Sequence, residues 1–151
     1  MLADRFEDHP VKRAAAATVT PLVRFVEWLF GPKAPGIDLW LGLFSAAWAG
    51  LMILRPSIFD VGTFRGMSWM PDATWIAFFV TLTAMHLTGM IRTEWRAMRW
   101  SACLLSAWIW ISVSASFATI EITTGVLCYA IVGAFAVCGA LYLSGQPRKA
   151  D

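Results

Sequence analysis

Charged residues are scarce in this sequence: Asp, Glu, Lys and Arg make up 15% of its 151 residues, whereas hydrophobic residues make up 58%. Soluble domains carry about 25% charged residues, so the composition excludes an ordinary soluble domain and indicates an integral membrane protein. The net charge is only +2, and no basic block is dense enough to follow a phosphate backbone. We therefore expect the lipid bilayer as a partner and no nucleic acid.

Cysteines and catalytic motifs are also few. Cys103, Cys128 and Cys138 all lie in apolar stretches and lack the CxxC spacing of a redox or zinc site, so we predict no metal. The sequence has no nucleophile elbow, no HExxH, no phosphate-binding glycine loop and no carboxylate pair at useful spacing. These absences predict a protein without catalytic residues, which is not an enzyme.

Four segments are apolar and long enough to cross a bilayer, which takes about 20 residues. They cover residues 37–54, 73–91, 98–120 and 122–144. Hydrocarbon offers no water to the backbone, and segments of this length satisfy their own hydrogen bonds as α-helices. We predict an all-α, polytopic four-transmembrane-helix bundle over 37–144, with an outer loop at 55–72.

The remaining segments are predicted to be cytoplasmic. In residues 1–36, Thr20-Pro21, an apolar run and Gly31-Pro32 are typical of a short amphipathic helix over about 21–30, which lies on the membrane surface or docks under the bundle. The GP-rich linker GPKAPG follows it. Residues 145–151 form a short tail, and no cleavable signal peptide is expected because the first 35 residues are mixed and charged.

The positive charges predict the topology, because Lys and Arg that flank a span are retained on the cytoplasmic side. Five precede the first span, three separate the second from the third, and two follow the fourth; the alternate connections hold two and none. Both termini should therefore be cytoplasmic. The small size and the lack of eukaryotic targeting features favour the bacterial inner membrane.

The outer loop, RPSIFDVGTFRGMSWMP, is too apolar for a solvated loop and too interrupted by Gly and Pro to span the membrane. Its large side chains must be buried against something. Simple capping of the bundle, contact with the lipid interface and a partner-binding surface are all open interpretations. The candidates for a partner surface are Phe59, Phe64, Trp69 and Met70.

Small and hydroxyl residues recur on the predicted spans, where they allow helices to approach closely. We interpret them as packing positions within one chain, in preference to contacts in an oligomer. They are Gly42, Ala46, Gly50, Ser112, Ser116, Gly125, Gly133 and Ala140.

His86 is predicted to be the single ionisable side chain in the middle of a span, with no membrane-embedded Asp or Glu beside it. Intramembrane ionisable groups are functional candidates, but we favour a structural histidine that bonds a Ser or Thr of a neighbouring helix. Trp108 and Trp110 lie mid-span and point in different directions. They either pack or line a site for an apolar ligand. No cofactor is predicted, although haem or quinone at His86 and these tryptophans stays open.

Three functions fit these observations. The preferred one is a non-catalytic structural or accessory subunit of a membrane assembly, with a protein partner or further copies of the chain. The second is a self-associating pore of the holin kind, suggested by the small size and the small-residue helix faces. The third is a small carrier or apolar-ligand binder that uses His86 with the serines of the third span.

Overall fold

The structure is a computed structural model that describes Arg24, Trp28, Gly31 and residues 33–56 and 58–145. The chain divides into two compact units, Met1–Gly36 and Ile37–Asp151. In the first unit, Arg24 and Trp28 are helical, while the rest of the helix predicted over about 21–30 lies outside the described residues, as does most of the tail predicted at 145–151.

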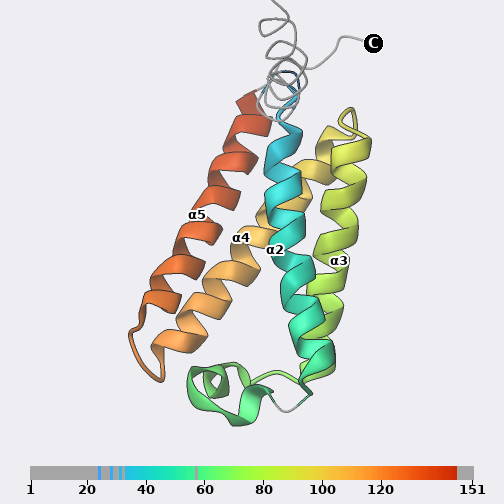
Figure 1. Ribbon diagram of the computed structural model, residues 1–151. Coiled ribbons are helices and arrows are strands. Elements are labelled where there is room, and N and C mark those ends of the chain that lie inside the picture. The colour runs from blue at the N-terminus through green and yellow to red at the C-terminus, as the bar shows by residue number, and fades with distance from the viewer. Residues whose placement is uncertain (1–23, 25–27, 29–30, 32, 57, 146–151) are drawn as a thin grey trace, which may run out of the picture. The chain divides into compact units, whose positions relative to one another are not determined.

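Four long α-helices make up the described fold: α2 (Pro35–Leu54), α3 (Asp72–Ile91), α4 (Arg96–Ala118) and α5 (Thr124–Gly145). Each is long and apolar enough to cross a membrane, and the described residues include no strand. The predicted all-α class with four apolar spans is confirmed. Figure 1 shows α4 alongside α5, with the α3–α4 turn at one end of the bundle and the α2–α3 connection at the other.

Helices α4 and α5 form the most extensive helix pair, because small residues let them approach closely. A Cβ added to Gly133 would lie 2.8 Å from Ile111 Cγ1. Farther along the same interface, Ala136 and Ala140 are buried with Cys103 and Ala107. Close packing at these small side chains of α5 thus stabilises the helix pair, because the hydrophobic effect contributes little to helix association in lipid.

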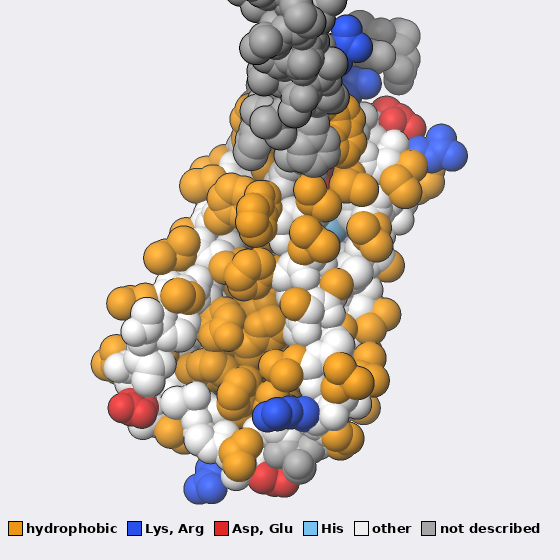
Figure 2. Space-filling view, viewed as in Figure 1, with side chains coloured by type: hydrophobic (Ala, Val, Ile, Leu, Met, Phe, Trp, Pro, Cys, Tyr) orange, Lys and Arg blue, Asp and Glu red, His pale blue; other side chains and the backbone are white. Residues whose placement is uncertain are grey.

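The larger core is aromatic and fills the space among the spans. Trp48, Trp75, Phe79, Trp110 and Phe117 are all buried in it. Trp48 meets Trp110 edge to face, with ring centroids 5.8 Å apart. Edge-to-face contacts are a favoured arrangement of aromatic rings, so these side chains stabilise the core by their geometry as well as by their burial. Figure 2 shows one face of the molecule, where hydrophobic side chains cover the flank of the helices and charged side chains gather near the two ends.

The outer loop caps the bundle through two short helices, η2 (Ile58–Asp60) and η3 (Gly62–Met67). Ile58, Phe59 and Met67 are buried in the aromatic core. Gly66 lies so close to α4 that an added Cβ would collide with the Ser116 carbonyl oxygen. Capping thus accounts for these buried side chains, whereas Val61 and Trp69 of the same loop are each 59% exposed.

Candidate functional site

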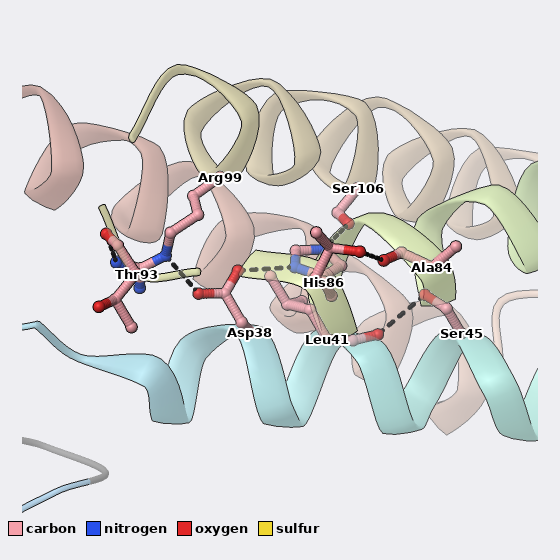
Figure 3. A network of polar contacts seen from close by, with 9 residues as sticks. Asp38, Leu41, Ser45, Ala84, His86, Thr93, Arg99 and Ser106 are labelled. Atoms are coloured by element: carbon pink, nitrogen blue, oxygen red, sulfur yellow. Dashed lines mark hydrogen bonds and ion pairs between the residues drawn. The ribbon is translucent and has the colours of Figure 1, made fainter. Parts of the chain in front are cut away.

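A buried polar network joins α2, α3 and α4 near one end of the bundle (Figure 3). Arg99 Nε lies 2.6 Å from Asp38 Oδ2, and His86 Nδ1 lies 3.0 Å from Asp38 Oδ1. On its other side, His86 Nε2 lies 2.8 Å from Ser106 Oγ. All four side chains are at most 2% exposed, so the three helices share one buried polar cluster.

The partners fix the direction of each hydrogen bond. Arg99 only donates, and a carboxylate paired with it only accepts, so Asp38 receives bonds from both Arg99 and His86 Nδ1–H. In a neutral imidazole protonated at Nδ1, the other nitrogen, His86 Nε2, accepts a hydrogen bond from the Ser106 hydroxyl. The donors point in sequence from Ser106 through His86 to Asp38, which is the acceptor at the centre of the network.

Two glycines make room for this network. A Cβ at Gly89 would lie 2.9 Å from Arg99 Cγ and 3.1 Å from Asp38 Oδ1. On α2, a Cβ at Gly42 would lie 3.2 Å from His86 Cβ. Gly42, predicted as a packing residue, therefore marks the point where α2 and α3 come close enough for Asp38 to reach His86.

The network adds Asp38 and Arg99 to the ionisable groups of the spans, where His86 was the one predicted in the middle of a span. Asp38 lies in the first turn of α2 and Arg99 in the first turn of α4, and both helices begin at the same end of the bundle. The two opposite charges therefore meet at matching depth, where charged side chains in a membrane pair with one another. The predicted absence of an embedded carboxylate was wrong for Asp38, which is 1% exposed.

The order Asp38–His86–Ser106 is that of a hydrolytic triad, in which a carboxylate orients an imidazole that activates a hydroxyl. The burial argues for another role, because Ser106 has 0% exposure and a substrate carbonyl needs access to its Oγ. Haem ligation by His86 meets a similar obstacle, since both ring nitrogens already hold hydrogen bonds. In this geometry, the network fastens three helices together.

The structure separates the other two ligand candidates. Trp110 is fully buried, whereas Trp108 is 50% exposed on the outside of the bundle, where it contacts Phe78. The prediction that these two rings point in different directions is confirmed. Trp110 Nε1 is buried and has no hydrogen-bond partner among the described residues. His86, Trp108 and Trp110 thus do not form one common site.

The predicted packing residues are divided among different environments. Gly133 and Ala140 lie in the α4–α5 interface, whereas a Cβ on Gly50 would meet nothing within 4 Å. Ser112 bonds to the carbonyl of its own helix at Trp108. Ala46 and Gly125 are partly buried.

Most of the side chains that were predicted to form a partner surface on the loop at 55–72 are buried or partly buried where this loop caps the bundle. Phe59 is 5% exposed, and Phe64 and Met70 pack partly buried against the core. Trp69 is 59% exposed, yet its Nε1 donates a hydrogen bond to Ser116 Oγ at 2.9 Å. Of these four side chains, Trp69 alone offers a large exposed surface.

A groove between α2 and α5 opens on the surface of the described spans. It has a volume of about 270 Å³ and is lined by Trp40, Leu41, Phe44, Ile131, Val132 and Phe135. Its walls are almost entirely apolar, and Trp40, Phe44 and Phe135 are each about half exposed. Such a groove accepts an apolar group, whereas the buried polar network accepts none in this conformation.

In comparisons with known proteins, no protein-family model, no curated protein and no solved structure matches this chain. The case for a function therefore depends on the chemistry of the described residues.

Proposed function

We propose that the chain is a non-catalytic integral membrane protein that acts as a structural or accessory subunit of a membrane assembly. The supporting observation is the closed polar network. Asp38, His86 and Ser106 bond to one another or to Arg99, and each is buried. Side chains that could act on a substrate are used to hold α2, α3 and α4 in one arrangement.

A rigid arrangement of spans suits a subunit whose task is to present a surface. The outward faces of the helices are apolar, with Leu43 on α2 and Leu127 on α5 more than half exposed. Interfaces within a bilayer depend on packing between such faces. A bundle that is already rigid loses little conformational entropy when a partner binds to it. We propose a protein partner, or further copies of this chain, on one of these faces.

We further propose the bacterial inner membrane, with both termini in the cytoplasm. Arg92 lies between α3 and α4 and Arg96 is the first residue of α4, both at the end of the bundle where α2 begins. Arg99 contributes less to this sidedness than its sequence position suggests, because Asp38 neutralises it inside the bundle. The N-terminal lysines and arginines keep the bias on the same side.

Site-specific photo-crosslinking in living cells tests the proposal. A photoreactive amino acid is placed, one position at a time, at exposed residues on three helices: Leu43 on α2, Leu87 on α3 and Leu127 on α5. The expected result is a discrete protein adduct from one helix face, with the other faces serving as matched controls. Uniform labelling by lipid from all three positions contradicts a subunit role.

The same cells report on the pore hypothesis, which stays a prediction. Phe79, Leu82 and Trp110 are fully buried and fill the interior of a single chain, so a pore would need several copies. Membrane potential is followed during induced expression, with an inert four-span protein at matched level. An intact potential is expected; its sudden collapse would replace the subunit proposal with a holin-like one.

A further inference from the structure

The two ends of the bundle differ in surface charge. Where α3 ends and α4 begins, Arg92 and Arg96 accompany a single acid, Glu94. Arg99 adds no net charge there, because Asp38 pairs with it inside the bundle. At the opposite end, the described acids outnumber the described bases. The acids are Asp60, Asp72 and Glu121, and the bases are Arg55 and Arg65. Among the described residues of Ile37–Asp151, the excess positive charge therefore lies at the α3–α4 end.

Both arginines at this end keep donors for an anion. Arg92 Nη1 lies 3.9 Å from Glu94 Oε1, and both side chains are at least 60% exposed, so this ion pair is weak. Arg96 Nη2 donates a hydrogen bond to the Ser144 carbonyl oxygen at 2.8 Å. That bond uses one of the five N–H groups of the guanidinium, and the rest have no acceptor among the described residues. A guanidinium that is held in place with further donors suits the oxygens of a phosphate.

An exposed apolar stripe runs along α4 from Arg96. Trp100, Leu104 and Trp108 follow at intervals of four residues on one side of the helix, and each is 40–50% exposed. Trp100 Nε1 donates a hydrogen bond to Ser144 Oγ at 2.9 Å, which holds this ring beside the arginine. At 1.5 Å per residue, the stripe extends about 18 Å from Arg96 to Trp108. One leaflet of hydrocarbon is about 15 Å thick, so the stripe is as long as one acyl chain.

The cationic end and the apolar stripe together narrow the ligand class. A free phosphate would use the arginines alone and leave the stripe unused. An amphiphile with a phosphate headgroup uses both, and its glycerol region would lie at the depth of the exposed indole rings of Trp95 and Trp100. The position of the arginines at the start of a membrane-spanning helix therefore favours a lipid as the source of the phosphate.

We propose that an anionic phospholipid binds at the α3–α4 end of the bundle. Its phosphate accepts hydrogen bonds from Arg96, Arg92 adds positive charge, and one acyl chain lies along Leu104 and Trp108. A zwitterionic headgroup carries its own cation and gains little from the excess positive charge. Phosphatidylglycerol should therefore bind more tightly than phosphatidylcholine. This site depends neither on the subunit role nor on the direction in which the chain crosses the membrane.

Native mass spectrometry of the full chain in a neutral detergent tests the proposal. The chain is titrated with phosphatidylglycerol and, separately, with phosphatidylcholine that carries the same acyl chains. The first phosphatidylglycerol is expected to bind at least fivefold more tightly than phosphatidylcholine. Arg92→Gln should weaken it about fivefold, which is the contribution of one arginine near a membrane surface, and Arg96→Gln should weaken it at least as much. Glu94→Gln should strengthen it, because the competing acid is removed.

The matched control is Arg65→Gln, which removes an exposed arginine at the other end of the bundle and should leave the affinity unchanged. Arg92 makes no hydrogen bond to the described residues, so Arg92→Gln tests the charge without breaking the contact between α4 and α5. Equal affinities for the two lipids, or equal effects of Arg92→Gln and Arg65→Gln, would overturn the proposal. Glycerol 3-phosphate at the same concentration should not displace the lipid. Displacement would show a site for free phosphate, in which the stripe has no role.

Discussion

Removal of the charge on Asp38 tests the polar network most directly. Asp38→Asn keeps the shape of the side chain, and its carbonyl can still accept the bond from His86 Nδ1. Its amide group, however, faces Arg99 Nε across a contact of 2.6 Å, where two donors now meet. The substitution therefore removes the Asp38 charge from beside a guanidinium that is 2% exposed.

The expected magnitude follows from burial. Breaking one partner out of a buried ion pair costs about 3–5 kcal/mol, because the remaining charge stays desolvated. Ser106→Ala removes one neutral hydrogen bond from the same network and should cost about 1 kcal/mol, or less within a bilayer. The free energy of unfolding should thus fall several times more for Asp38→Asn than for Ser106→Ala.

Unfolding by sodium dodecyl sulfate in mixed micelles, followed by circular dichroism, measures these free energies. Glu121→Gln is the matched control, since this carboxylate is exposed in the α4–α5 turn and its loss should cost under about 0.5 kcal/mol. Adding Arg99→Met to Asp38→Asn removes the unpaired charge and should restore part of the stability. Equal losses for Asp38→Asn and Ser106→Ala, without any recovery in the double variant, would refute the reasoning.

Three further predictions concern packing and topology. Gly89→Ala places a methyl against the ion pair and should destabilise by about 1–3 kcal/mol, whereas Gly50→Ala, with nothing within 4 Å, should stabilise by about 0.5–1 kcal/mol in the same titration. Gly66→Ala should displace the outer cap from α4 and increase proteolysis of the loop; unchanged cleavage rates would show that the cap does not depend on this contact. Glu94 and Glu121 are both exposed, at opposite ends of α4. Glu94→Cys should react with an impermeant maleimide only after cell lysis, whereas Glu121→Cys should react in intact cells. The reverse pattern would show that the topology is inverted.

The spans could be predicted from the sequence because a bilayer requires a long, continuous apolar helix, and few other environments impose that pattern. The predicted ends differ from the observed ones by at most two residues. Helix α2 begins at Pro35, two residues before the predicted start, since proline suits the first turn of a helix. Helix α4 begins at Arg96, two residues before the predicted start at 98, and its fourth residue, Arg99, is buried.

The candidate site was half predicted. His86 was singled out, and its expected hydroxyl partner is Ser106. Arg99 was missed because it was counted as a positive charge that flanks the third span, and Asp38 was not singled out. Counting depth from each helix start would have found them, since both are the fourth residue of helices that begin at the same end. The groove and the unpaired Trp110 nitrogen depend on how α2 packs against α5, and one helix pattern contains no such information.

The placement of the network explains why a small membrane bundle keeps buried charges at all. Apolar helices in lipid gain little from burial against one another, and smooth faces can pack in several registers with similar energies. Asp38 can meet both Arg99 and His86 at 2.6 and 3.0 Å in only one register of α2 against α3 and α4. Any slip by one turn, about 5.4 Å, would leave charges unpaired in hydrocarbon at a cost of several kcal/mol. The network thus selects one arrangement of spans, and the aromatic core and the groove both depend on that arrangement.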